Sequence, residues 1–130
     1  MTKTLIILAL LSLLNPNTVH AQNETSGDFR VCPEQPPTPE WVTNMPFRQA
    51  HMQLLAQQMY RAQSLEAVVV SQECSCTTRF PPWDEVRTHF LELHANLDRW
   101  GATEKTEKYR NIANQYRPIA MPICEAQGNW

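Results

Sequence analysis

Apolar residues recur along the chain at the spacing of three and four that places side chains on one face of an α-helix. The first such segment covers residues 46–73, which contain no glycine and no proline after Pro46. Asn44 is a candidate N-cap, and a proline is tolerated in the first turn of a helix. We therefore expect a helix over 46–73, with an apolar face formed by Phe47, His51, Leu54, Leu55, Met59, Ala62, Leu65 and Val69.

A second segment has the clearest periodicity in the chain. Two prolines precede it, and Asp84 and Glu85 place negative charge in its first turn, where the helix dipole favours it. Gly101 follows as a candidate left-handed stop. The pattern predicts a helix over 82–100 with a narrow apolar seam formed by Trp83, Val86, Phe90, Leu93, Leu97 and Trp100.

A third helix is expected over 103–117. Thr103 can cap its first turn, and its apolar positions repeat the spacing of three and four. The residue before a proline avoids the helical conformation, so Pro118 predicts that the helix ends near Tyr116. The apolar positions of this segment are Tyr109, Ile112, Tyr116 and Ile119.

Three amphipathic helices joined by short turns predict an all-α domain over 46–130, a small antiparallel three-helix bundle that runs up, down and up. Residues 22–45 contain four prolines and predict an extended, proline-rich arm in front of it. A chain of 130 residues fits one domain. With 13 acidic and 11 basic residues, it lacks the basic excess typical of a nucleic-acid-binding protein.

Residues 1–21 have the three-part layout of a secretory signal peptide. Lys3 precedes an apolar run over 5–14, and Ala21 lies before the expected cleavage site at Gln22. The run is too short to cross a bilayer, which needs about 20 apolar residues. We therefore expect an exported protein with no membrane span after cleavage.

Four cysteines follow the signal segment, and an even number in a small exported protein indicates two disulfides. The Cys74-Ser75-Cys76 spacing differs from the two-residue gap of common zinc sites, and a bond between these two neighbours is geometrically unfavourable. In an up-down-up bundle, Cys124 returns to the end where Cys74 and Cys76 lie, and the arm can bring Cys32 there. Two pairings remain open: Cys32–Cys74 with Cys76–Cys124, or Cys32–Cys76 with Cys74–Cys124.

The sequence offers no catalytic or metal-binding motif. Its three histidines beyond the signal segment lack the carboxylate spacing of a di-iron site, and His89 and His94 fall on different sides of a helix, where solvent exposure is expected. His51 lies on an apolar face and is expected to be partly buried. No nucleophile elbow, phosphate loop or dinucleotide motif occurs. We therefore expect no enzymatic activity, no cofactor and no metal site.

Four aromatic residues lie in proline-rich or terminal segments, where a helical core does not require them. Aromatic side chains next to rigid prolines are good anchors for partner proteins. The alternative is that Trp41 and Phe80 cover the ends of the bundle. The candidate partner-binding residues are Trp41, Phe80, Trp83 and Trp130.

Two segments, CSCTTRFPPW at 74–83 and CEAQGNW at 124–130, resemble small exported proteins encoded on proteobacterial conjugative plasmids and integrative elements. Those proteins accompany type IV secretion genes. The resemblance implies a periplasmic location and a non-enzymatic structural or adaptor role in a transfer apparatus, through contacts with other envelope or secretion-machine proteins. It implies no catalytic residues. The alternative is a small secreted, disulfide-stabilised binder, such as an inhibitor, effector or exclusion factor.

Overall fold

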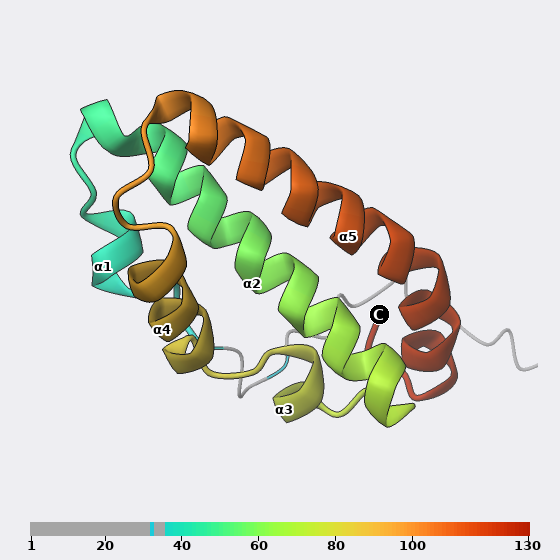
Figure 1. The fold of residues 1–130 in the computed structure, drawn as a ribbon. Helices are drawn as coiled ribbons and strands as arrows, with labels where there is room; N and C mark the ends of the chain where they lie inside the picture. Colours follow the sequence, from blue (N-terminus) through green and yellow to red (C-terminus); the bar gives the residue numbers. More distant parts are fainter. Residues whose placement is uncertain (1–31, 33–35) are drawn as a thin grey trace, which may run out of the picture.

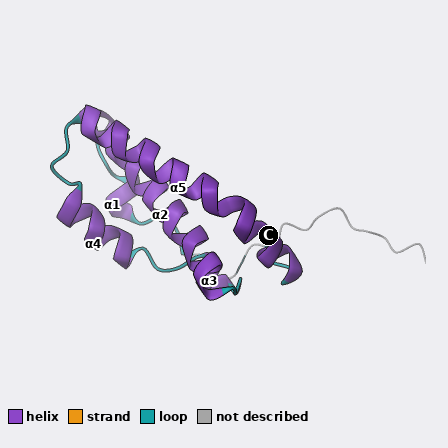
Figure 2. Ribbon diagram, turned by 45° about the vertical axis from the view of Figure 1, so that its right-hand side comes forward, coloured by secondary structure: helices purple, strands orange, loops and turns teal. Residues whose placement is uncertain are grey.

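The computed structural model describes Cys32 and residues 36–130, which form helices joined by short connections (Figure 1). No strand occurs within this described part (Figure 2), so the predicted all-α class is confirmed. None of its helices is long and apolar enough to cross a bilayer. The elements are α1 (Glu40–Thr43), the 3-10 helix η1 (Phe47–Gln49), α2 (Ala50–Ser71), α3 (Cys76–Arg79), α4 (Asp84–Leu93) and α5 (Arg99–Ala126).

Helix α2 lies between α4 and α5 (Figure 1). Helices α2 and α5 run in the same direction. The Arg61 guanidinium donates to Asn114 Oδ1 at 3.0 Å midway along the pair. Near the C-terminal ends, Gln127 Nε2 donates to the carbonyl of Gln72 at 3.4 Å. The shorter α4 runs in the opposite direction (Figure 1). Both long helices therefore begin at one end of the molecule and finish at the other.

Two apolar clusters hold these helices together. The first joins α1, α4, the N-terminal half of α2 and the start of α5, and the second joins the C-terminal halves of α2 and α5. On α5 the buried apolar residues are mostly alanines, which allow its backbone to approach α2 closely. The buried residues are Val42, Met52, Leu55, Ala56, Met59, Val86, Phe90 and Ala102 in the first cluster, and Ala62, Leu65, Val68, Cys74, Ala113, Ala120 and Cys124 in the second.

The predicted helix over 82–100 is wrong at its C-terminal end. Helix α4 ends at Leu93, and a new helix begins at Arg99, because the Asp98 side chain accepts a hydrogen bond from Gly101 N–H at 2.7 Å and caps it. Gly101 therefore lies in the first turn of α5 instead of ending a helix. The apolar seam breaks here as well: Leu93 is 63% exposed and Trp100 is 80% exposed.

The predicted end of the third helix near Tyr116 is also wrong. Helix α5 has 28 residues and continues through Pro118 and Pro122. Pro118 and Asn114, whose carbonyl loses its helical partner, are both exposed, so water can replace the missing hydrogen bond. Beyond Pro118, Ala120 and Cys124 are buried against α2. Tertiary packing thus outweighs the local preference of proline.

The arm predicted over 22–45 is helical in part of its described portion. Helix α1 forms one turn over Glu40–Thr43, and Val42 is completely buried under α2 and α4. The expected signal peptide at 1–21 and most of the expected arm lie outside the described residues.

Two disulfides are present, as predicted, and they follow the second of the two pairings left open. Cys32 is bonded to Cys76 with a Cα–Cα distance of 5.4 Å, and Cys74 to Cys124 with a distance of 5.0 Å. Both bonds meet at the three-residue corner after α2. The corner therefore joins the N-terminal segment, α3 and the end of α5 at one point.

Candidate functional site

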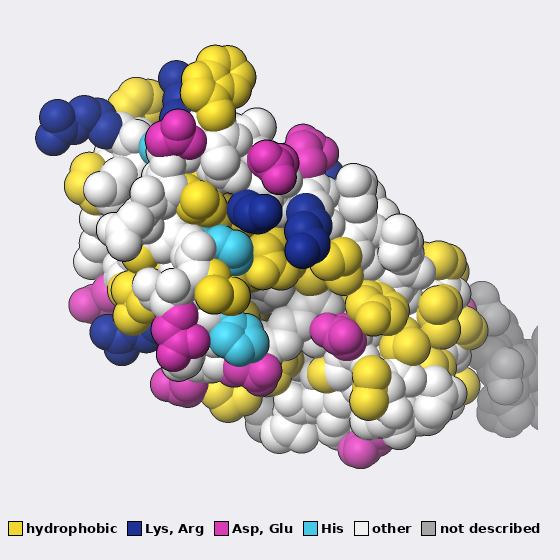
Figure 3. Space-filling view, viewed as in Figure 1, with side chains coloured by type: hydrophobic (Ala, Val, Ile, Leu, Met, Phe, Trp, Pro, Cys, Tyr) yellow, Lys and Arg dark blue, Asp and Glu magenta, His cyan; other side chains and the backbone are white. Residues whose placement is uncertain are grey.

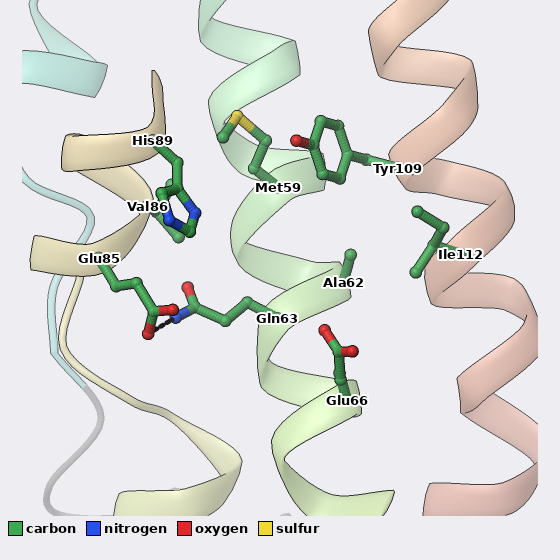
Figure 4. A pocket seen from close by; sticks show the side chains of 9 residues that line it. All are labelled: Met59, Ala62, Gln63, Glu66, Glu85, Val86, His89, Tyr109 and Ile112. Carbon is green, nitrogen blue, oxygen red and sulfur yellow. Dashed lines mark hydrogen bonds between the residues drawn. The ribbon is translucent and has the colours of Figure 1, made fainter. Parts of the chain in front are cut away.

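A hollow of about 130 Å³ lies where α4 and α5 flank α2. It is visible near the centre of the face drawn in Figure 3, with histidine and acidic side chains on its edge, and is enlarged in Figure 4. All three helices contribute to its lining: Met59, Ala62, Gln63 and Glu66 from α2, Glu85, Val86 and His89 from α4, and Tyr109 and Ile112 from α5.

The inner part of this hollow is apolar and its edge is polar. Met59, Ala62 and Val86 are each exposed by no more than 4% and belong to the two core clusters. By contrast, the side chains of Glu66 and Glu85 are exposed at the edge. A surface of this kind accommodates a side chain with an aliphatic body and a charged head.

Gln63 connects the edge of the hollow to its interior. Its amide nitrogen donates to Glu85 Oε2 (Figure 4), which orients the amide across the gap between α2 and α4. The amide oxygen Oε1 is buried and has no hydrogen-bond partner in the described part of the chain. In Figure 4 this oxygen points toward Val86 and His89 of α4. An unpaired buried acceptor is costly, and because this oxygen has almost no accessible surface, a molecule in the hollow does not reach it unless the Gln63 side chain moves.

Glu66 is positioned by α5. Its Oε1 accepts a hydrogen bond from the Tyr116 hydroxyl at 3.2 Å. This hydrogen bond and the negative charge of Glu66 raise the pKa of Tyr116. The carboxylate is therefore held beside the hollow, and its second oxygen accepts no hydrogen bond from the described residues.

A second, more open hollow of about 270 Å³ continues from the first toward the C-terminal end of α2. The two share Gln63, Glu66 and Glu85, so we treat them as one groove and call it the α2 groove. Its far part is lined by Val70, which is 75% exposed, and by Pro81. The α2 groove therefore combines two carboxylates with apolar surface at both ends.

Two of the four candidate partner-binding aromatics belong to the edge of the core. Trp41 and Trp83 meet edge to face with ring centroids 6.2 Å apart, and Trp41 also lies 5.4 Å from the ring of Phe90. Both indoles are partly buried against the first apolar cluster. The geometry matches the alternative in which Trp41 covers the bundle, and it places Trp83 next to the first turn of α4.

The other two aromatics lie near the disulfide end of the molecule. The Arg79 guanidinium lies over the rings of Phe80 and Trp130, at 4.9 and 5.1 Å from their centroids. Arg117 also lies over the Trp130 ring, at 4.9 Å. Trp130 is 37% exposed. The structure therefore divides the four aromatics into two pairs instead of bringing them into one surface.

The histidines of the described residues belong to no cluster of metal-ligating side chains. Within residues 36–130 and Cys32, no group of three or more His, Cys, Asp or Glu side chains is arranged to hold a metal ion. His94 was expected to be solvated, but it is only 6% exposed, and its Nε2 lies 3.1 Å from the Tyr109 hydroxyl. Burial lowers the pKa of His94. The contact with Tyr109 places its ring against α5.

The sequence did not reveal the α2 groove because its carboxylates have local explanations. Glu85 is a favourable first-turn residue of α4, and Glu66 lies on a polar face of α2. Only the packing of α4 against α2 brings the two into one groove. In comparisons with known proteins, no family model matches the chain, and no curated protein or solved structure is significantly similar to it.

Proposed function

We propose that this chain is a non-enzymatic structural or adaptor protein of the periplasm, which binds other proteins of a conjugative, type IV secretion-like apparatus. Two disulfides are typical of proteins that fold in an oxidising compartment outside the cytoplasm. The resemblance of residues 74–83 and 124–130 to small exported proteins of conjugative elements supports the assignment to a transfer apparatus.

The α2 groove is the single observation that carries a binding role. Its wall on α4 is held by Tyr60, whose hydroxyl donates to the Pro81 carbonyl at 2.8 Å, and by the stacking of the Tyr60 ring on Trp83. The opposite wall belongs to α5, which the Cys74–Cys124 bond ties to the end of α2. A surface whose walls are fixed in advance loses little conformational entropy when a partner binds.

Site-specific photocrosslinking in cells tests this proposal. The photoreactive residue p-benzoylphenylalanine is placed at Val70, which lines the α2 groove. Leu91, which is 56% exposed on α4 and does not line the groove, is the matched control position. We expect a discrete crosslinked product at position 70, absent at position 91, in cells that carry the transfer apparatus.

The same cells are fractionated and scored for DNA transfer. We expect the protein in the periplasm and a lower transfer frequency when its gene is deleted, restored by complementation. Recovery of the protein from the culture medium with unchanged transfer would contradict the adaptor proposal and favour the alternative, a secreted binder that acts outside the cell.

A further inference from the structure

We infer that the end of the molecule opposite the two disulfides binds the surface of an anionic lipid bilayer. The binding surface consists of two exposed aromatic residues, Phe47 and Trp100, and two exposed arginines, Arg48 and Arg99, and we call it the aromatic tip. The inference goes beyond the proposed protein-binding function and does not depend on the α2 groove. It is carried by the exposure of the aromatic rings, the charge around them and the small size of the surface.

The aromatic tip carries the two most exposed large apolar side chains of the described residues. Phe47 is 95% exposed and Trp100 is 80% exposed. Neither side chain belongs to one of the two apolar clusters or packs against it. The core therefore does not require these rings, and both can be buried in another environment without changing the fold.

The fold brings the two aromatic rings to the same end of the molecule. Phe47 lies in η1 directly before α2, Trp100 lies in the first turn of α5, and both long helices begin at this end (Figure 1). Phe47, Arg48 and Arg99 line one hollow of about 250 Å³, so the two segments are neighbours in space. Residues distant in sequence thus form one exposed surface, which single scattered apolar residues do not.

The charge of the aromatic tip is positive. Neither Arg48 nor Arg99 forms an ion pair with a described residue, and no described carboxylate lines the hollow between them. The acidic residues closest in sequence to Arg99 have other partners: Asp98 caps α5, and Glu104 lies 3.6 Å from Lys105 Nζ. Hydrophobic and basic side chains project furthest at this end (Figure 3). The tip therefore complements a negatively charged surface.

The size of the aromatic tip favours a lipid surface over a protein. The tip is formed by the ends of two neighbouring helices, each about 10 Å across with its side chains, so its area is roughly 200 Å². A stable protein interface buries roughly 800 Å² on each partner. A bilayer requires no such area, because aromatic rings are stable at the level of the headgroups while arginines are attracted to anionic lipids. Two aromatic and two arginine side chains match this environment.

Binding by the aromatic tip would also orient the molecule on the bilayer. Helices α2 and α5 begin at the tip, and the Cys74–Cys124 bond joins their other ends (Figure 1). The disulfide end then faces away from the lipid. The α2 groove lies along the side of α2 and stays accessible to a protein partner.

Vesicle flotation tests the inference. The oxidised protein without the expected signal peptide at 1–21 is mixed with vesicles of phosphatidylcholine alone, or of phosphatidylcholine and phosphatidylglycerol in equal amounts. We expect flotation with the anionic vesicles and about tenfold weaker binding to the neutral ones, because each arginine near an anionic surface adds to the attraction. Salt should weaken binding to the anionic vesicles, since it screens the arginines. No binding to anionic vesicles, or equal binding to both kinds, would overturn the inference.

Variants of the aromatic tip locate the binding. Phe47→Ala and Trp100→Ala should each weaken binding to the anionic vesicles about tenfold, because each removes a large apolar side chain from the lipid contact. Arg48→Gln and Arg99→Gln should each weaken it about fivefold. Since all four residues are exposed, the melting temperature of each variant should match that of the wild type.

Matched control variants remove the same kinds of side chain from exposed positions of α4. Leu91→Ala removes an exposed apolar residue, and Arg87→Gln removes an exposed positive charge. Both should leave vesicle binding unchanged. Weakening by the controls as strong as that by the tip variants would show that the tip is not the contact and would overturn the inference.

Fluorescence quenching identifies the ring that enters the lipid. Lipids with brominated acyl chains quench a tryptophan that is inserted among them, and the chain contains four tryptophans. Trp100→Phe removes one fluorophore but keeps an aromatic anchor, so the variant should still float with anionic vesicles. We expect quenching in the wild type and its loss in Trp100→Phe. Quenching that persists in this variant would assign the lipid contact to another tryptophan and overturn the inference.

Discussion

Trp83 stacks on Tyr60, with ring centroids 4.0 Å apart and ring planes within 8° of parallel. Trp83 precedes the first turn of α4, and Tyr60 lies in the middle of α2. The Tyr60 hydroxyl also donates to the Pro81 carbonyl at 2.8 Å. One tyrosine thus fixes both the backbone that leads into α4 and the aromatic residue at its start. It thereby sets the position of the α4 wall of the groove.

Tyr60→Phe should lower the free energy of unfolding by about 0.5–1.5 kcal/mol, the net contribution of one hydrogen bond, because the Pro81 carbonyl loses its donor while the stack remains. Urea denaturation of the oxidised protein measures this loss. Tyr116→Phe, which removes a more exposed hydrogen bond to Glu66, is the control and should have a smaller effect. Equal losses for both variants would contradict the role assigned to Tyr60.

The same residue should make the protein sensitive to alkaline pH. Burial raises the pKa of Tyr60 to about 12, although the charge of Arg79 partly opposes this. A tyrosine in the unfolded chain loses its proton near pH 10, before the buried Tyr60 does. The free energy of unfolding is therefore unaffected below about pH 10 and decreases as the pH rises toward 12. In an absorbance titration of tyrosinate, the group that titrates near pH 12 should be present in the wild type and missing in Tyr60→Phe.

His94 should make the protein sensitive to mild acid. Burial lowers the pKa of His94, and Lys105 and Lys108 act in the same direction. A histidine in the unfolded chain takes up a proton near pH 6.5, before the buried His94 does. The free energy of unfolding is therefore unaffected above about pH 6.5 and decreases as the pH falls below it. Denaturation at several pH values should show a steeper loss in the wild type than in His94→Gln. Tyr109→Phe keeps the histidine and should keep the steep slope.

Two neighbouring apolar residues of α4 should respond very differently to truncation. Phe90 is 5% exposed and contacts Trp41, so Phe90→Ala should cost about 3–5 kcal/mol of stability. Leu93 is 63% exposed, so Leu93→Ala should change stability by less than about 0.5 kcal/mol. Chemical denaturation distinguishes the two. A loss above about 2 kcal/mol for Leu93→Ala would show that α4 packs with a different face.

The Cys74–Cys124 bond should hold the part of α5 that lies beyond Pro118. In the double variant Cys74→Ser/Cys124→Ser, we expect a loss of about 2–4 kcal/mol, with the fastest hydrogen exchange at the C-terminal end of α5. The matched control, Cys32→Ser/Cys76→Ser, leaves α5 tied to α2 and should spare this segment. Thiol titration of the oxidised wild type should find no free thiol. Uniform exchange across α5 in both variants would contradict this role.

Phe80→Ala tests whether the connection between α3 and α4 contributes to partner binding. Phe80 is partly buried and lies beside Arg79, outside both apolar clusters. We expect weaker binding to the crosslinked partner, by about 2 kcal/mol if Phe80 is an anchor, with a nearly unchanged melting temperature. A lower melting temperature with unchanged affinity per folded molecule would identify Phe80 as a cover of the core.

The fold was predictable from the sequence where local and tertiary preferences agree. Val86 and Phe90 follow helical spacing and are buried as expected, and α2 nearly coincides with the expected first helix. The apolar spacing predicted the wrong helix boundary where one N-cap residue outweighs the periodicity. Asp98 starts a new helix although Leu97 and Trp100 continue the apolar spacing. Pro118 does not end α5, because the residues beyond it pack against α2 and Cys124 is bonded to Cys74.

The candidate site was less predictable because its parts come from three helices. The proline-rich context marks Trp83 and Phe80 as candidate partner-binding residues, which stays a prediction, and the sequence did not indicate that Trp83 would stack on Tyr60. Glu66 and Glu85 are separated by a complete change of chain direction. Their proximity depends on the packing of Val86 against α2, which residue spacing within one helix does not determine.

The two disulfides also determine which bonds carry a pulling force through the molecule. Tension applied to the chain on either side enters at Cys32, crosses to Cys76, passes through Ser75 to Cys74 and leaves at Cys124. Helices α1 and α2 lie within the first covalent loop, and α4 and the part of α5 up to Cys124 lie within the second. Apart from the two residues of α5 beyond Cys124, these helices are not in series with the applied force. As long as both bonds are oxidised, a pull on the chain ends therefore stretches a three-residue bridge, while the α2 groove stays free of load.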